Sequence, residues 1–258
     1  MQKANENAIR KYLSENAQSI KIEAVDVVDS TNDEMKRRAL KGEKEISLLI
    51  AEKQLKGRGT RGRSFHSPEG TGIYMSFLLR PPYSPSECTL LTAMAAVCTA
   101  EAIEKVTGGK TNIKWVNDIY IENRKVSGIL TQSHFSSDGK TVEWSVLGIG
   151  INITEPEGGF PEEIKSIAGT VGDSVPDTKN RIIAEIINGF YYYYPRLREK
   201  TFRKGYSDRL LWRGDKIRVT QGDKSYEAIL VDIDDDFRLK VRTADNSEIV
   251  IESADISV

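Results

Sequence analysis

The sequence predicts an α+β protein whose C-terminal part is a small β-barrel. Segments that alternate in polarity or are rich in Ile and Val occur between helical segments over residues 20–154, which is the pattern of a sheet covered by helices. The apolar segment 89–108 predicts one long buried helix that Gly108 ends. After Gly205 the chain changes to short strands joined by Gly, Asp and Asn turns, which is typical of a small barrel.

The expected elements follow from local patterns. Capping residues at 30–33 can begin the second helix, and Pro195 should kink or split the last one. In chain order we predict a helix over 6–16, a strand over 20–28, a helix over 32–42, a strand over 45–54, a glycine-punctuated loop over 57–72, a strand over 73–80, a proline turn at 81–85, the helix 89–108, one strand from 112 to a tight turn at 122–124, a strand to 135, an Asp-Gly turn at 137–140, a strand over 141–154, a polar loop over 155–178, and a helix over 180–204. A domain boundary near 207–212 divides the chain into residues 1–207 and 208–258.

Composition excludes several classes of protein. Thirty-seven basic and 38 acidic residues leave a net charge of −1 over 258 residues, which is not the balance of a cationic nucleic-acid binder. Two cysteines, Cys88 and Cys98, are too few for a disulfide framework, and buried free thiols suit a reducing cytoplasm. No apolar segment has the length of a membrane span, and the N-terminus lacks the apolar core of a signal peptide.

The loop Gly57–Arg63 has the strongest local signal. Five basic residues and one acidic residue within 52–63 give a local charge of +4, and glycines 57, 59 and 62 allow the backbone to expose its N–H groups. Exposed amides and guanidinium groups together can hold phosphate. A flexible nucleic-acid tether is the alternative, but long loops between strands of a compact domain are usually functional.

The second signal lies in residues 114–130. Lys114, Asn117 and Asp118 precede a tight turn and Lys125, and on paired strands Asn117 and Lys125 can share one cleft. A single carboxylate beside phosphate-binding lysines suggests Mg²⁺ carried largely by substrate phosphates, with Asp118 as its protein ligand. An ordinary hairpin with solvated charges remains the alternative. The two histidines, His66 and His134, are isolated, so a protein zinc site is not expected.

Five motifs in order resemble the biotin protein ligase family (biotin–[acetyl-CoA-carboxylase] ligases) over residues 28–258. They are Val28–Asn32, Gly57–Arg63, Lys114–Asp118, Lys125–Leu130 and Gly148–Asn152. The resemblance implies a ligase domain of the class II aminoacyl-tRNA synthetase/biotinyl-lipoyl ligase type with a mixed β-sheet, followed by a Src-homology-3-like barrel. It also implies that biotin and ATP form biotinyl-5′-AMP, with Mg²⁺, before biotin passes to one lysine of a biotin carboxyl carrier protein.

The resemblance assigns roles residue by residue. Lys125, Arg63 and Asp118 are the expected catalytic residues, Asp118 also being the expected metal ligand and the candidate for orienting the acceptor amine. The expected biotin-binding residues are Ser30, Thr31, Asn32, Gln54, Gly57, Arg58, Gly59, Thr60, Lys125, Gly128 and Gly148, the last two leaving room for the ligand. The expected adenylate-binding residues are Arg58, Arg61, Arg63, Trp115, Asn117, Lys125 and Asn152.

The sequence departs from the family pattern at two positions. Thr60 stands where the family often has Arg, and loss of that guanidinium predicts faster release of biotinyl-5′-AMP. Val116 stands where the family usually has Pro, and we expect it to extend the strand at little cost. Only 27 residues precede Val28, too few for a helix-turn-helix domain, so DNA binding is not expected.

Two other functions remain open from the sequence. A lipoate-type ligase shares the general scaffold, although the arginine-rich loop and Lys125–Leu130 favour biotin. An RNA-binding module would need stacking aromatics beside the loop, which Phe65 and Tyr74 could supply. Residues 206–258 contain eight basic and twelve acidic residues, which argues against RNA. We expect a cytoplasmic enzyme without membrane contact, either a monomer or a homodimer.

Overall fold

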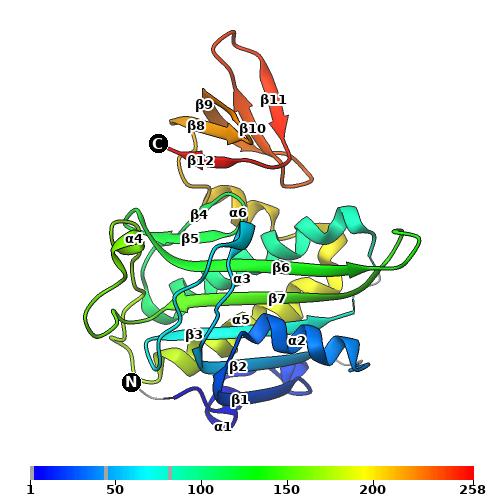
Figure 1. Cartoon of the computed structure of the whole chain (residues 1–258), viewed down its shortest axis with the longest axis vertical. Coiled ribbons are helices and arrows are strands. Elements are labelled where there is room, and N and C mark those ends of the chain that lie inside the picture. The colour runs from blue at the N-terminus through cyan, green and yellow to red at the C-terminus, as the bar shows by residue number, and fades with distance from the viewer. Residues whose placement is uncertain (1–2, 44–45, 81–82) are drawn as a thin grey trace.

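The structure is a computed structural model that describes residues 3–43, 46–80 and 83–258. Its larger part is built on a seven-stranded mixed sheet in the order β1-β2-β3-β7-β6-β5-β4 (Figure 1). Strands β1 and β2 are parallel, and all other neighbours in this sheet are antiparallel. The strands are β1 Lys21–Val28, β2 Ser47–Gln54, β3 Gly72–Leu79, β4 Asn112–Lys114, β5 Asp118–Ile121, β6 Arg124–Phe135 and β7 Val142–Asn152.

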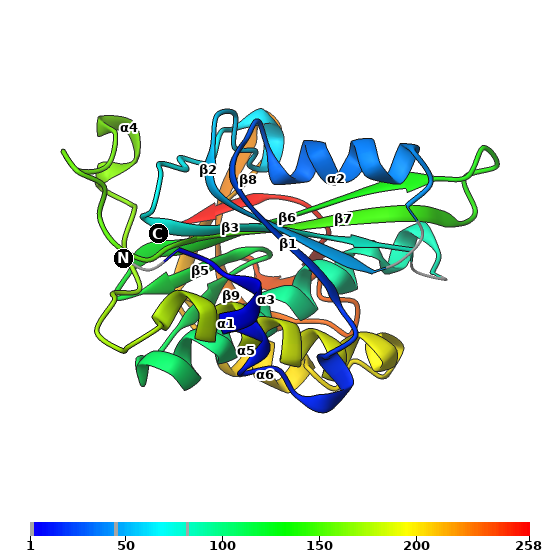
Figure 2. The ribbon, with the colours of Figure 1, turned by 90° about the horizontal axis from the view of Figure 1, so that it is seen from below.

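Helices cover the two faces of this sheet unequally. Figure 2 shows α2 on one face, with the short α4 at the edge of the same side, and α1, α3, α5 and α6 on the other. The α-helices are α1 Glu6–Arg10, α2 Thr31–Leu40, α3 Cys88–Thr107, α4 Glu162–Lys165, α5 Thr178–Tyr193 and α6 Arg203–Asp208. Since α2 is ten residues long, it covers only part of its face, and the rest of that face is left for the loop after β2.

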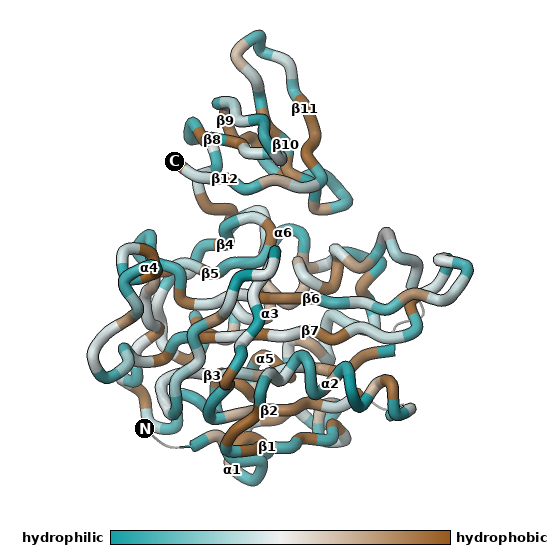
Figure 3. The backbone as a smooth tube through the Cα atoms, in the orientation of Figure 1, coloured by the Kyte–Doolittle hydropathy of each residue, from teal (hydrophilic) through white to brown (hydrophobic). Residues whose placement is uncertain are grey.

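Burial follows the prediction from hydropathy. Strand β3 is buried along its whole length, because α3 and α5 cover one face and α2 the other. Helix α3 contributes 12 buried residues to the main core, which explains its apolar sequence. A smaller core beneath α2 contains Met35, Leu49, Leu78 and Trp144. Figure 3 shows α2 as mostly hydrophilic and β2, which lies beneath it, as mostly hydrophobic.

The C-terminal residues form a second sheet beyond the β4 edge of the first (Figure 1). It has the order β11-β10-β9-β8-β12 and is antiparallel throughout. Its strands are β8 Lys216–Gln221, β9 Lys224–Ile233, β10 Leu239–Arg242, β11 Glu248–Ile251 and β12 Asp255–Ser257. The predicted small β domain is therefore present, while the boundary between 207 and 208 stays a prediction.

A hydrogen bond and a ring stack join the two sheets. Trp115 Nε1 in the β4–β5 turn donates to the carbonyl oxygen of Phe237 at 2.8 Å. The Phe237 ring stacks on Phe202 at a centroid distance of 5.1 Å. Tyr206 donates its hydroxyl to the carbonyl of Val116 at 3.1 Å, from beneath the same turn. Because Trp115, Phe202 and Phe237 are all buried, the C-terminal sheet is fixed against the end of the larger sheet.

Some predicted elements differ from the structure. The single strand expected over 112–121 is two strands, β4 and β5, with residues 115–117 in a turn, so Val116 does not extend a strand. Tertiary contacts of Trp115 and Val116 outweigh the β-propensity of both residues here. The first helix is shorter than 6–16, and the loop 155–178 contains α4. The last helix is split near Pro195, as predicted.

The proline turn and the two cysteines were also predicted from the sequence. Positions 81 and 82 of the predicted proline turn lie outside the described residues. Cys98 is buried as expected, whereas Cys88 is only half-buried, and both are free thiols. In the described ranges, no helix combines the length and apolar composition needed to cross a bilayer.

Candidate functional site

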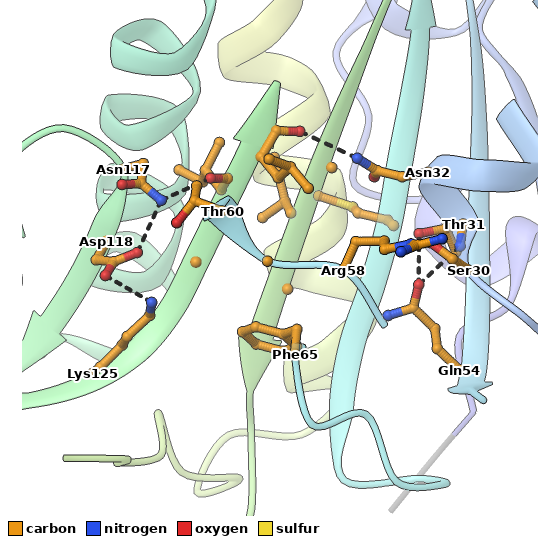
Figure 4. A pocket seen from close by; sticks show the side chains of 18 residues that line it. Ser30, Thr31, Asn32, Gln54, Arg58, Thr60, Phe65, Asn117, Asp118 and Lys125 are labelled. Atoms are coloured by element: carbon orange, nitrogen blue, oxygen red, sulfur yellow. Dashed lines mark hydrogen bonds and ion pairs between the residues drawn. The ribbon is translucent and has the colours of Figure 1, made fainter. Parts of the chain in front are cut away.

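A cavity lies on the α2 face of the sheet. It is bounded by the start of α2, the loop after β2, and the glycine-containing stretches of β6 and β7. Figure 4 shows two polar clusters that face each other across these strands, with Phe65 between them. Motifs that are far apart in the sequence meet here because β2, β3, β7, β6 and β5 are consecutive neighbours in the sheet.

The N-terminus of α2 and the end of β2 form the first polar cluster. Ser30 is the N-cap of α2, and its Oγ accepts a hydrogen bond from the Asp33 amide at 3.4 Å. Thr31 donates from its amide and its Oγ1 to Oε1 of Gln54, at 2.8 and 3.0 Å. Gln54 Nε2 donates to Ser67 Oγ at 2.9 Å. These buried, fixed donors and acceptors can complement a small ring that carries both kinds of group.

Asn32 extends this cluster across the strands. Its Nδ2 donates to Oε1 of Gln132 at 3.0 Å, and its Oδ1 accepts from Ser76 Oγ at 2.6 Å. A Cβ built at Gly148 would lie 2.0 Å from Asn32 Oδ1. The room that Gly148 provides is therefore filled by Asn32, which differs from the expectation that it is left for the ligand.

The glycine-rich loop forms the wall of the cavity. Phe65 lies over the strands, and a Cβ at Gly150 would approach its ring to 2.6 Å. A Cβ at Gly128 would lie 3.3 Å from Lys125 Cε and 3.4 Å from the Phe65 ring, so Gly128 admits both side chains. Arg58 anchors the loop to α2 through Nε, which lies 2.9 Å from Asp33 Oδ2.

The second polar cluster carries the charge. Lys125 Nζ lies 2.7 Å from Asp118 Oδ2, and both side chains are mostly covered. Asn117 Nδ2 donates to Asp118 Oδ1 at 3.1 Å and to the Ile129 carbonyl at 2.9 Å. The structure thus brings Asn117 and Lys125 to one cavity, although Asn117 lies in a turn rather than on a strand, and Asp118 lies between them rather than at the rim. Lys125 can exchange this carboxylate for a ligand anion without leaving the cavity.

A larger cavity continues from this cluster toward the C-terminal sheet. It is lined by the arginine-containing part of the loop, the β4–β5 turn, the segment after α4, and residues 252–256. Arg61 forms an ion pair with Asp255, and Arg63 Nη2 lies 3.5 Å from the same carboxylate. The second sheet therefore supplies an anion to the loop that the sequence predicts to bind phosphate.

Lys114 adds a further cation to the larger cavity. Burial lowers the pKa of its ammonium, an effect that the nearby Asp118 carboxylate opposes and Lys125 reinforces. Its Nζ lies 5.2 Å from the centroid of the Trp212 ring and 6.0 Å from that of Tyr120. Cations from three elements thus converge on one space, and such a space suits a polyanion.

Most predicted site residues line one or both cavities. The smaller cavity contains Ser30, Thr31, Asn32, Gln54, Arg58, Gly59, Thr60, Asn117, Asp118, Lys125, Gly128 and Gly148. The larger contains Gly59, Thr60, Arg61, Arg63, Trp115, Asn117, Asp118, Lys125 and Asn152. Gly57 lines neither; a Cβ there would lie 2.3 Å from the Phe65 carbonyl oxygen, so it allows the loop to fold on itself.

Sequence reasoning missed several lining residues. From the sequence, Phe65 is a candidate only for stacking on RNA bases. In the structure, its ring covers the smaller cavity. Met75, Leu130 and Ile149 give that cavity an apolar lining, and the alternation in their strands is the only sequence signal for it. Nothing in the C-terminal sequence indicates that Asp255 meets the arginine loop, because that contact depends on the packing of the two sheets.

The residues present give a metal ion few ligands. In the part of the chain that the structure describes, no three His, Cys, Asp or Glu side chains are grouped as metal ligands. Asp118 is the carboxylate beside the lysine cluster, and it is already paired with Lys125. The donor set fits a Mg²⁺ ion held mainly by nucleotide phosphates with Asp118 as its one protein ligand.

Comparison with family models gives two matches. Residues 24–152 match the model of the Biotin/lipoate A/B protein ligase family. Residues 214–258 match the model of the biotin protein ligase C-terminal domain. The second match coincides with the five-stranded sheet, so both sheets of the molecule have counterparts in one group of proteins.

Known proteins are similar over most of the chain. The bifunctional ligase/repressor BirA of Bacillus spizizenii is 32% identical over 99% of this chain and 79% of its own length. The biotin–[acetyl-CoA-carboxylase] ligase of Mycobacterium tuberculosis is 28% identical over 84% of this chain and 82% of its own. The solved structure of an Aquifex aeolicus biotin protein ligase in complex with biotin and ATP has a TM-score of 0.74 at 27% identity, covering 92% of this chain and 98% of that one.

Proposed function

Because the chain belongs to the Biotin/lipoate A/B protein ligase family, we propose that it is an ATP-dependent biotin protein ligase. It joins biotin to AMP and then transfers biotin to a lysine of a biotin carboxyl carrier protein or domain. The pair of joined cavities is the main structural support for this function. One has a polar end and an apolar lining for a small bicyclic ligand, and the other gathers cations for a nucleotide.

In the first step, a biotin carboxylate oxygen attacks the α-phosphorus of ATP and pyrophosphate leaves. Two anions must approach each other, so cations have to offset their repulsion and the charge that develops in the transition state. Lys125 lies where the two cavities join and is placed to contact both the carboxylate and the α-phosphate. Arg63, Arg61 and Lys114 lie on the nucleotide side.

The remaining roles follow from position. Ser30, Thr31, Asn32 and Gln54 bind the ureido ring, and Phe65 covers the ligand. The backbone of residues 57–60 and the side chain of Arg58 complete that wall. Asn117 and Asn152 contact the adenylate, while Trp115 holds the C-terminal sheet against the nucleotide side. The loop 57–67 closes over the adenylate, since a mixed anhydride left in water would hydrolyse.

In the second step, the acceptor lysine amine attacks the acyl carbon and AMP leaves with the bonding electrons. The amine must lose a proton in this step. Asp118 lies beside Asn117 and Lys125 at the junction of the cavities, where its carboxylate is placed to orient the amine and take that proton. A Mg²⁺ ion bound with ATP would neutralise phosphate charge, and Asp118 is the residue that would hold it.

Other functions have less support. The family also includes lipoate ligases, but the Mycobacterium tuberculosis relative and the Aquifex aeolicus structure are named as biotin ligases. An RNA-binding role needs an exposed stacking aromatic, whereas the Phe65 ring is half-buried and occupies the space that a Cβ at Gly150 would need. We place the reaction in the cytoplasm, where ATP and carboxylases meet and where Cys98 stays a thiol.

The transfer step is tested with a purified carrier domain that has one acceptor lysine. The protein, biotin and Mg-ATP should add one biotin to that lysine, as measured by intact-mass spectrometry. Replacing the acceptor lysine by Arg is the matched control and should abolish labelling. Labelling by lipoate in place of biotin, or no labelling at all, would contradict the proposal.

A further inference from the structure

Ser76 lies on β3, beneath the first polar cluster, which we propose binds the ureido ring. It lines neither cavity. Its side chain is fully buried. Its Oγ lies 2.8 Å from Thr31 Oγ1 and 2.6 Å from Asn32 Oδ1, and both of these residues line the smaller cavity. Ser76 is also the β3 residue paired with Gly148, whose missing side chain allows Asn32 to reach it. The hydroxyl is thus placed to set the positions of two residues that face the ligand.

The hydrogen bonds around Ser76 leave the cluster one proton short. The hydroxyl of Thr31 already donates to Gln54 Oε1 at 3.0 Å. The amide of Asn32 is turned with Nδ2 toward Gln132 Oε1, 3.0 Å away, which leaves Oδ1 toward Ser76. Ser76 therefore has one proton and two acceptors within hydrogen-bond distance. Whichever acceptor it does not serve keeps an unpaired lone pair, and that acceptor belongs to a residue that lines the cavity.

We propose that Ser76 is a positioning residue for biotin, whose single hydroxyl proton is shared between Thr31 and Asn32 until an N–H of the ureido ring takes one of them. This inference rests on the proposed function and deepens it. A ring N–H donates to one acceptor, and the Ser76 proton then goes wholly to the other. No buried acceptor stays unpaired once the ligand is bound, which is the condition under which buried polar groups favour binding.

The same arrangement discriminates between ring types. A cyclic urea offers N–H donors, so it can satisfy the open acceptor. A dithiolane ring, the ring of lipoate, has no N–H donor and would leave that acceptor desolvated and unpaired. A site that is built to accept a hydrogen bond from a substrate N–H binds a ligand without that N–H much more weakly. Ser76 thereby contributes to the choice of biotin over lipoate without touching either.

The test is Ser76→Ala in biotin-dependent ATP–pyrophosphate exchange. The biotin KM should rise roughly fivefold to thirtyfold, in keeping with loss of one or two ordered hydrogen bonds, while kcat and the ATP KM stay near their wild-type values. Desthiobiotin, which keeps the cyclic urea, should lose affinity by the same factor. A purely structural serine would not divide the two KM values in this way.

Ser145→Ala is the matched control. Ser145 is also fully buried in the same sheet, and its hydroxyl shares a 2.7 Å hydrogen bond with Ser133, but it lines neither cavity. Its biotin KM should match the wild type. If Ser76→Ala does not fold, Ser76→Cys replaces the hydroxyl by a weak donor with less change in packing, and the same rise in biotin KM is expected.

Failures of the inference and of the proposed function are distinguishable. An unchanged biotin KM in Ser76→Ala, or an equal rise in Ser145→Ala, overturns the inference while wild-type exchange still supports the function. Failure of both Ser76 variants to fold, under conditions where Ser145→Ala folds, also overturns it, because the hydroxyl would then serve the fold. Absence of biotin-dependent exchange in the wild type overturns the proposed function itself.

Discussion

Three glycines on one face of the sheet determine the shape of the smaller cavity. Gly128 and Gly150 pair across β6 and β7, and Gly148 lies two residues before Gly150. A side chain at any of them would meet a group that lines the cavity, either Asn32, Phe65 or Lys125. Because these glycines lack side chains, the side chains of the site can lie directly on the strands.

Gly148→Ala tests this account. Its Cβ would lie 2.0 Å from Asn32 Oδ1, so Asn32 must leave Ser76 and Gln132. We expect biotin affinity to fall by about tenfold or more, equivalent to about 1.4 kcal/mol, measured by isothermal titration calorimetry. Gly109→Ala, at an exposed glycine whose nearest neighbour for a Cβ is 3.3 Å away, is the control. Unchanged biotin affinity in Gly148→Ala would disprove the steric argument.

The side chain at position 60 should affect how long the adenylate stays bound. It lines both cavities, where a longer cationic side chain could contact the adenylate phosphate. Thr60→Arg should slow dissociation of biotinyl-5′-AMP by roughly tenfold, the effect of one added charge-assisted hydrogen bond, as followed by stopped-flow fluorescence. Thr60→Gln, which adds length without charge, is the comparison. Equal rates in the wild type and Thr60→Arg would mean that this position does not control adenylate retention.

Among the elements, α2 positions half of the first polar cluster through its first turn. Its N-cap is Ser30, and the preceding Asp29 is held by Arg37, eight residues further on, at 2.7 and 2.9 Å. This hydrogen bonding lowers the pKa of Asp29 from 3.8 to about 2. The helix is therefore tied to the segment that leads into it.

This ion pair predicts a pH dependence of stability. As the pH falls, the unfolded chain protonates Asp29 near 3.8 and the folded chain only near 2, so the stabilisation is complete above about pH 4 and is lost toward pH 2. Arg37→Gln should lower the urea midpoint at pH 6, and the gap to the wild type should narrow as the pH falls from 5 to 3. Lys41→Gln, at the exposed C-cap of α2, should leave the midpoint unchanged. A gap that does not depend on pH would refute the assignment to Asp29.

Elements differed in how far the sequence predicted them. Strands β1, β2, β3 and β7 and helix α3 follow from apolar patterns that their local sequence carries, and each lies within a few residues of its expected range. The turn at 115–117 could not be foreseen, because Trp115 and Val116 favour strands and are held in a turn by contacts with Phe237 and Tyr206. For the same reason the motif residues of the site could be named, while Ser76 could not. Its role depends on its pairing with Gly148 across two strands.

At the scale of the whole molecule, the nucleotide side of the site is shared between two sheets. Residues 252–256 line the larger cavity opposite the arginine loop, and Asp255 pairs with Arg61. The near-zero net charge of the chain is thus an average over a basic loop and an acidic C-terminal part that meet at this cavity. Such an arrangement makes nucleotide binding depend on how the second sheet is held.

Trp115→Phe tests that dependence. It removes the 2.8 Å hydrogen bond from Nε1 to the Phe237 carbonyl and leaves a buried acceptor unpaired. We expect the ATP KM to rise roughly tenfold, as for about 1.4 kcal/mol, with the biotin KM nearly unchanged, in steady-state exchange assays. Trp144→Phe, in the core beneath α2, is the control and should not change the ATP KM. Equal increases in the two KM values would count against a specific role of the second sheet on the nucleotide side.

We propose above that this molecule activates biotin with ATP and that Lys125 stabilises the transition state of that step. Biotin-dependent exchange of radiolabelled pyrophosphate into ATP measures that step alone, without a carrier protein. The wild type should show exchange with biotin and none with lipoate, and Lys125→Gln should reduce it by roughly 10²-fold or more, as for loss of one transition-state cation. Exchange that needs lipoate, or that Lys125→Gln leaves intact, would contradict the account.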